Sequence, residues 1–179
     1  MKELTMATAV VVLLLAGSAL AADEAPSRDG PLAALAPFID GEWHFDGKWA
    51  NGEPLKAREV FEWGLGKKFV TTRTWVINNN GDEYERYRST FAVKDGKPVM
   101  YNFAYDGESS VDEVKVTGKV IDVRRSAKTP AGEMVIRQEI ELTEKDKFRW
   151  RVWLDRDGES QQIIEGEWVR KAVGKEGEK

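Results

Sequence analysis

Apolar and polar residues alternate with a period of two along most of the chain from Gly41 to Arg170. Such alternation is typical of strands with one buried face. Turns containing glycine interrupt the alternation, among them Asp95-Gly96 and Asp157-Gly158, where Asp and Gly tolerate the left-handed backbone of tight hairpins. We therefore expect ten strands, at residues 41–49, 55–63, 68–77, 83–93, 98–105, 110–117, 120–125, 133–142, 147–155 and 160–170.

A short segment with helical spacing precedes the strands. It follows Asp29, which can cap a helix, and Pro31, which is a favoured first helical residue. The segment predicts one short helix whose apolar residues are Leu32, Leu35, Phe38 and Ile39.

The two ends of the strand region carry nearly the same pentapeptide, Ile39-Asp40-Gly41-Glu42-Trp43 and Ile164-Glu165-Gly166-Glu167-Trp168. In a closed antiparallel sheet the first and last strands pair, and a glycine two residues before a tryptophan lets the ring lie over bare backbone. An open sheet of this size would leave two bare edges. We expect an all-β, antiparallel up-and-down barrel over residues 31–170, with a two-sheet sandwich as the alternative.

The register of two hairpins decides which side chains face the interior, because a shift of one residue exchanges the two faces of a strand. Three-residue loops at Lys94-Asp95-Gly96 and Arg156-Asp157-Gly158 separate apolar from charged residues better than two-residue turns, and we favour them. The resulting inward faces carry mainly aromatic residues. We expect these inward residues: Trp43, Phe45, Phe61, Trp63, Phe69, Trp75, Tyr87, Phe91, Tyr101, Phe103, Ile136, Ile140, Phe148, Trp150 and Trp168, with Arg73, Ser89, Gln138 and Gln162 as polar members.

A few polar groups among aromatic residues are what a cavity for a small, largely apolar ligand needs. A solid core is the alternative, in which Arg73 reaches the rim and the glutamines bond to backbone or trapped water. If the cavity exists, the candidate ligand-binding residues are Trp43, Trp63, Arg73, Trp75, Tyr87, Tyr101, Phe103, Gln138, Trp150 and Gln162.

Residues 1–21 have the pattern of a secretory signal peptide, with Lys2, an apolar run from Met6 to Ala16, and the small-x-small cleavage site Ala19-Leu20-Ala21. The run is shorter than the roughly 20 residues that cross a bilayer, which makes a retained membrane anchor the less favoured alternative. We therefore expect export to the bacterial periplasm or the extracellular space, with no stable membrane insertion after cleavage. Residues 22–30 predict a linker and residues 171–179 a flexible tail.

The 179 residues include no cysteine, which excludes disulfides, thiolate metal sites and a cysteine nucleophile. The net charge is −4 and the basic residues are scattered along the strands, so we expect no nucleic-acid partner. The single histidine, His44, alternates out of phase with Trp43 and should lie on the outer face. Acidic segments around Asn80 and Asp157 have turn chemistry without the spacing of a calcium loop. We expect no catalytic constellation, metal site or cofactor.

The Gly41-Glu42-Trp43 strand opening after a short helix resembles the calycin superfamily of lipocalins and fatty-acid-binding proteins. The chain looks most like the uncharacterised lipocalin-like domains of secreted bacterial proteins, through Trp63-Gly64-Leu65-Gly66-Lys67-Lys68-Phe69 and Tyr105-Asp106-Gly107. The resemblance covers Leu32 to Val169 and implies a barrel that binds apolar molecules. Lys67 replaces a glycine of that pattern, and the last strand lacks the Arg-x-Tyr clamp that would imply a fatty-acid headgroup site.

Two other functions stay open. One is a ligandless interaction domain that uses its outer face or rim, where Trp49 and Trp153 would be exposed. The other is an enzyme acting on a hydrophobic substrate, although the carboxylates mostly alternate outward. Glu139 and Glu141 fit cross-strand ion pairs, and the group of Asp112, Glu113 and Lys115 predicts a solvated edge.

Overall fold

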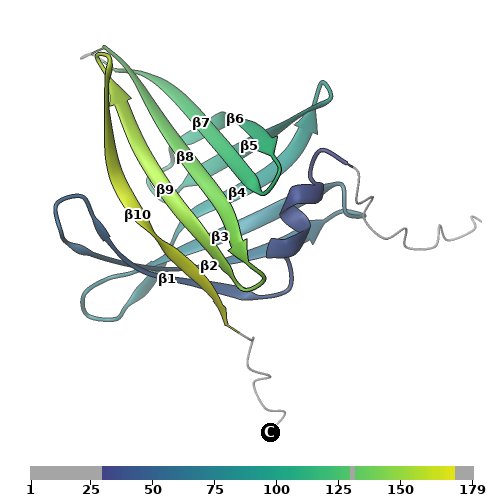
Figure 1. The fold of residues 1–179 in the computed structure, drawn as a ribbon, viewed down its shortest axis with the longest axis horizontal. Helices are drawn as coiled ribbons and strands as arrows, with labels where there is room; N and C mark the ends of the chain where they lie inside the picture. Colours follow the sequence, from purple (N-terminus) through teal and green to yellow (C-terminus); the bar gives the residue numbers. More distant parts are fainter. Residues whose placement is uncertain (1–29, 130–131, 172–179) are drawn as a thin grey trace, which may run out of the picture.

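The computed structural model describes residues 30–129 and 132–171, so the predicted signal peptide and nearly all of the predicted linker and tail lie outside it. Its ten strands form a closed antiparallel up-and-down barrel (Figure 1). Each strand pairs with the next along the chain, and the last pairs with the first, which confirms the barrel over the sandwich. The strands are β1 (Glu42–Trp49), β2 (Pro54–Gly64), β3 (Phe69–Ile77), β4 (Glu83–Lys94), β5 (Lys97–Ala104), β6 (Ser109–Thr117), β7 (Val120–Thr129), β8 (Gly132–Glu144), β9 (Lys147–Arg156) and β10 (Glu159–Lys171).

The predicted short helix is a 3-10 helix, η1 (Ala33–Phe38), at one end of the barrel (Figure 1). Its side chains Leu35 and Phe38 are buried, and the Phe38 carbonyl accepts a hydrogen bond of 2.8 Å from the indole N–H of Trp43. No side chain caps its first turn, and the predicted cap Asp29 lies outside the described residues. Because Phe38 packs on interior rings, η1 closes its end of the barrel. The described part of the chain holds no helix long and apolar enough to cross a membrane.

Strands β1 and β10 close the barrel, with Phe45 opposite Trp168. A Cβ atom added to Gly166 would lie 2.3 Å from the Phe45 ring. The glycine therefore makes room for a ring from β1, whereas the sequence suggested that it accommodates Trp168 of its own strand.

The predicted three-residue loop between β4 and β5 is wrong. Lys94 pairs with Lys97, so Asp95-Gly96 is a two-residue turn with φ values of 52° and 76°. Positive φ at both central residues is the geometry that matches the twist of a hairpin, and Asp-Gly is a preferred sequence for it. The inward side of β5 consequently carries Met100 and Asn102, and the outward side carries Tyr101 and Phe103.

The turn between β9 and β10 is also a two-residue turn, because Arg156 pairs with Glu159. A bulge at Ile163 then shifts the register by one residue. The bulge restores the predicted inward positions of Trp150, Val152, Ile164 and Trp168, but it leaves Gln162 opposite Trp153 on the outer face.

Aromatic residues fill the η1 end of the interior. Neighbouring ring centres in this cluster lie 4.9 to 5.9 Å apart, at the separations that aromatic pairs prefer. The cluster contains Phe38, Trp43, Phe45, Phe61, Phe148, Trp150 and Trp168.

Candidate functional site

Polar side chains from seven consecutive strands, β2 to β8, face the middle of the barrel interior. The strand registers place them on the inner face, in phase with inward apolar residues such as Phe61, Phe91 and Ile121. We call this group the polar layer, and it consists of Glu59, Thr72, Thr74, Ser89, Asn102, Asp112, Arg125 and Gln138.

The surroundings of Glu59 on β2 shift the pKa of its carboxyl group. Burial raises its pKa to about 7, because the charged form loses hydration, while hydrogen bonds from Thr74 and Thr72 act in the opposite direction. The Thr74 hydroxyl donates to the Glu59 carboxyl at 3.0 Å. Near neutral pH the carboxyl is therefore present in both protonation states, so it can accept or donate a hydrogen bond to a bound molecule.

Asp112 on β6 forms an ion pair within the layer. Its side chain is fully buried, and Arg125 of β7 donates to its two oxygens at 3.1 and 3.2 Å. The predicted solvated edge is wrong at this position, because Asp112 alternates with inward Val114 and finds its counterion across the strand pair. Buried charges are tolerated in this paired and hydrogen-bonded form.

Two neutral pairs complete the layer. Ser89 donates to the side-chain oxygen of Asn102 at 2.7 Å, and the indole N–H of Trp150 donates to the side-chain oxygen of Gln138 at 3.2 Å. The second bond leaves the amide N–H groups of Gln138 without a hydrogen-bond acceptor among the described residues. Those groups can donate to a ligand in the interior.

The interior is not filled along its whole length. Trp43 and Phe148 at the η1 end are 0% and 1% exposed. By contrast, inward side chains farther from η1 remain half-buried although strands surround them, including Glu59, Ile136 and Gln138. In a solid core these side chains would be as fully packed as the aromatic cluster.

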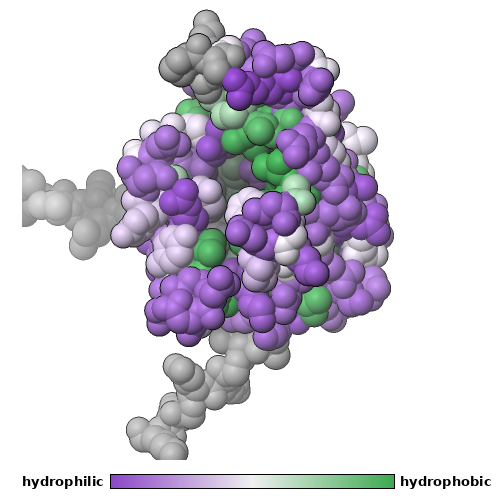
Figure 2. All heavy atoms as spheres, turned by 90° about the vertical axis from the view of Figure 1, so that its left-hand side faces the viewer, coloured by the Kyte–Doolittle hydropathy of each residue, from purple (hydrophilic) through white to green (hydrophobic). Residues whose placement is uncertain are grey.

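The face of the molecule away from η1 shows the corresponding recess, with hydrophobic residues along its wall and a hydrophilic rim (Figure 2). A shallow pocket of about 450 Å³ lies at this rim, between the β1–β2 turn around Asn51 and the bulged Ile163. Another shallow pocket, about 550 Å³, surrounds Val135 on the outer face of β7 to β10. The barrel is thus closed at η1 and hollowed toward its opposite end, which we call the open end.

Five of the ten predicted ligand-binding residues face the interior. Trp43 is sealed beneath η1 in the filled half, and the others remain half-buried. The five inward residues are Trp43, Trp63, Tyr87, Gln138 and Trp150.

The predicted inward position of the other five is wrong. On β3, Val70 and Thr72 occupy the inside, so Arg73 and Trp75 face outward. The guanidinium groups of Arg58 and Arg73 lie 3.7 and 4.6 Å from the Trp75 ring and shield it from water. The two-residue β4–β5 turn places Tyr101 and Phe103 on the outer face, and the bulge at Ile163 does the same for Gln162.

Sequence reasoning missed most of the polar layer. Glu59 was detectable, because it alternates in phase with Phe61 and Trp63, both of which were expected inside. Asn102 depended on the length of the β4–β5 turn.

The predictions for His44, for the ion pairs of Glu139 and Glu141, and for the turn at Asn80 are confirmed. His44 lies on the outer face, 2.5 Å from the Glu42 carboxylate, and Arg151 pairs across strands with Glu139 and Glu141. Within the described residues, no group of three or more His, Cys, Asp or Glu side chains is placed to hold a metal ion. The segment around Asn80 is a turn, in which the Asn78 side chain accepts from the Asp82 N–H at 2.8 Å.

No protein-family model matches the sequence, and no curated protein matches it. Among solved structures, the chain is similar to a de novo designed fluorescence-activating beta barrel, with a TM-score of 0.42, 13% identity and coverage of 77% of this chain and 98% of that one. It is similar to a redesigned beta barrel with a TM-score of 0.40, 12% identity and coverage of 77% and 95%. It is also similar to the barrel EF1p2_mFAP2b bound to DFHBI, with a TM-score of 0.42, 14% identity and coverage of 78% and 99%.

Proposed function

We propose that this protein is an exported, lipocalin-like barrel that holds a small, largely apolar molecule in the hollow part of its interior. The observation that carries the proposal is that Glu59 and Gln138 of the polar layer remain half-buried at the inner end of an otherwise apolar space, whereas Thr72, Ser89, Asn102 and Asp112 of the same layer are buried. Interior polar groups that water or a ligand can still reach are the groups that fix the orientation of a bound molecule.

The chemistry of the walls defines the ligand. Apolar side chains such as Leu55, Ile136 and Val152 face the space on the side of the open end, so most of the ligand should be apolar. Its inner end should form hydrogen bonds, because the Gln138 amide can donate and the Glu59 carboxyl can accept or donate. The signal-peptide pattern of residues 1–21 supports export, and the Gly41-Glu42-Trp43 opening supports the lipocalin-like assignment.

The test is native mass spectrometry, followed by organic extraction, of protein purified from the compartment to which its own cell delivers it. We expect a stoichiometric small molecule. Ile136→Trp should fill the hollow part and remove that molecule, whereas Val111→Trp, at a position that is 57% exposed on the outer face, should retain it. A ligand-free mass for the folded wild-type protein and for folded Val111→Trp, with no binding of an apolar fluorescent dye to either, would refute the proposal.

A ligandless interaction domain is the second candidate, because apolar residues gather on the outer face of β5, β6 and the turn that joins them. Phe103 is 53% exposed, Tyr105 is 72% exposed and Val111 is 57% exposed, and exposed apolar groups of this kind mark many protein contacts. Phe103→Ser and Trp153→Ala would test whether this face or that of β9 is required for capture of an envelope partner.

A further inference from the structure

The two ends of the barrel carry opposite charge. In an up-and-down barrel alternate turns lie at opposite ends, and four turns lie at the η1 end (Figure 1). Counted from the last residue of one strand to the first of the next, these turns contain seven lysines and three acidic residues. They are Lys67, Lys68, Lys94, Lys97, Lys119, Lys145 and Lys147, against Asp95, Glu144 and Asp146.

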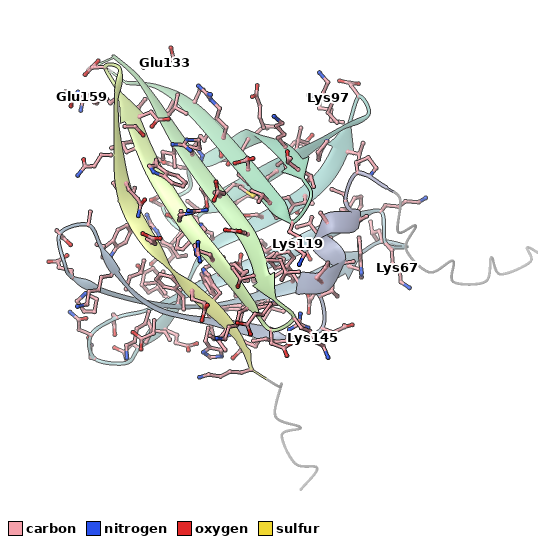
Figure 3. The ribbon with its side chains drawn as sticks, viewed as in Figure 1. Lys67, Lys97, Lys119, Glu133, Lys145 and Glu159 are labelled. Atoms are coloured by element: carbon pink, nitrogen blue, oxygen red, sulfur yellow. The ribbon has the colours of Figure 1, made fainter. Side chains whose placement is uncertain are left out.

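The described turns at the open end have the reverse composition, with seven acidic residues and one arginine. Figure 3 shows this polarity, with Lys67, Lys97, Lys119 and Lys145 at one end of the barrel and Glu133 and Glu159 at the other. The acidic residues of the turns are Glu53, Asp82, Glu83, Asp106, Glu108, Asp157 and Glu159, and the arginine is Arg156.

Most lysines at the η1 end are available to an external anion. Lys147 pairs with Glu144 and Glu167, but the other six form no ion pair with any residue that the structure describes. Five of those six are exposed and Lys67 is half-buried. Their charges are therefore not neutralised by ion pairs with the described residues.

An apolar residue projects from the same end. Leu65, in the β2–β3 turn beside Lys67 and Lys68, is 81% exposed, which is the highest exposure among the large hydrophobic residues of the described chain. Its φ of 25° and its two flanking glycines hold it at the tip of the turn. An exposed leucine beside two lysines, at a barrel end that carries further lysines, provides the two elements of interfacial membrane binding, because the apolar group can enter the acyl boundary while the cations meet phosphates.

We propose that the η1 end docks on the surface of an anionic phospholipid bilayer, with Leu65 inserted and the unpaired lysines over the headgroups. The acidic open end is repelled by the same surface, so the charge polarity fixes the orientation of a protein whose net charge is negative. A nucleic acid would satisfy the lysines but would offer Leu65 no apolar phase, and the turn lysines form no continuous stripe along which a phosphate backbone could run.

The first experiment is flotation of the mature protein, as released by its own cell, with vesicles of phosphatidylcholine alone or with about one third phosphatidylglycerol. We expect binding only to the anionic vesicles, and less binding as salt is raised. Lys97→Gln combined with Lys119→Gln should lower the partition coefficient about twenty-five-fold, at roughly fivefold per lysine. Asn51→Asp combined with Asn79→Asp changes the net charge equally at the open end and should leave binding nearly unchanged.

The second experiment reports the orientation of the protein on the membrane. Because the sequence contains no cysteine, a single introduced cysteine is the only thiol that a dye can label. An environment-sensitive dye on Leu65→Cys should shift to the blue with anionic vesicles, whereas the same dye on Asn79→Cys should not. Leu65→Asn should weaken binding about tenfold without harming the fold, because the side chain is exposed and Asn tolerates positive φ.

Equal binding to neutral vesicles, equal effects of the lysine and asparagine pairs, or a blue shift at position 79 would each overturn the proposal. Light scattering that rises with protein concentration in the absence of vesicles, and disappears in salt, would instead assign the two charged ends to head-to-tail association of copies.

Discussion

The guanidinium group of Arg170 lies 4.5 Å from the centre of the Trp43 ring. The same group donates to the carbonyl oxygens of Ile39 and Asp40 at 3.1 and 3.3 Å, and to that of Pro37. One residue near the end of β10 therefore holds both the first strand and the segment that follows η1. The planar, five-donor guanidinium suits this role better than an ammonium group does.

Arg170→Ala is expected to lower the free energy of unfolding by about 2–4 kcal/mol, because it removes a ring contact and several hydrogen bonds from a charged donor. Arg170→Lys should recover only part of that loss. Urea unfolding followed by tryptophan fluorescence measures both. Arg149→Ala, at a side chain that is 47% exposed with one ion pair of 3.8 Å, is the control and should change stability by less than about 1 kcal/mol.

Gly166→Ala is expected to destabilise the barrel by about 1–3 kcal/mol, since the new methyl would overlap the Phe45 ring. In the Phe45→Leu background the same change should cost less, because the smaller side chain leaves room. A double-mutant cycle of urea midpoints measures this coupling. Equal costs in the two backgrounds would show that Phe45 is not the reason for the glycine.

Asp112→Asn is expected to destabilise the protein by about 2–4 kcal/mol, because it leaves the Arg125 charge without its partner in the interior. Replacing both residues, as Asp112→Leu with Arg125→Met, should cost less than the single change, since no buried charge remains. Thermal unfolding of the three proteins in the same buffer decides the point. A double variant as unstable as Asp112→Asn would indicate that packing around the pair matters more than its charge.

Glu59 predicts a dependence of stability on pH. Its pKa in the folded state is about 7, above the ordinary 4.5, so the folded protein binds the proton more tightly than the unfolded chain. The contribution to stability is therefore fully present below about pH 4.5, declines as pH rises toward 7, and is lost above it. The decline amounts to at most about 3 kcal/mol, and solvent in the half-buried space reduces it.

Glu59→Gln stays neutral at every pH, so its stability advantage over the wild type should grow between pH 4.5 and 8. Thr74→Val should move the decline to higher pH, because it removes a hydrogen bond that lowers the pKa of Glu59. Urea unfolding across this pH range measures both effects. A constant difference between the wild type and Glu59→Gln would contradict the assignment.

The number and order of the strands could be predicted because alternation and turn residues are local signals. Trp43, Phe148 and Trp168 were placed inside correctly for the same reason. The face of β5 could not be fixed in this way, since it depends on whether the Asp95-Gly96 turn has two or three residues. The bulge at Ile163 is similarly invisible in the sequence, yet it turns Gln162 outward while keeping Ile164 inside.

Most of the polar layer was missed for a different reason, although Ser89 and Gln138 were expected inside. Alternation with Phe61 favours an inward Glu59, but a carboxyl group is costly to bury, and its compensation comes from Thr74 on the neighbouring strand. Trp75 shows the opposite case, because an indole expected inside is covered on the outer face by two arginines from β2 and β3. A partner on a neighbouring strand contributes at both positions, Thr74 for Glu59 and Arg58 for Trp75, and such partners become known only with the register.

An even number of strands returns the chain to the side on which it began, and Glu42 indeed pairs with Lys171 at the η1 end. A tag, tether or passenger domain joined before β1 or after β10 would therefore emerge beside the lysines and leave the open end of the barrel unobstructed. Under the two proposals made above, a ligand would enter and leave at the open end while the η1 end lies on the membrane.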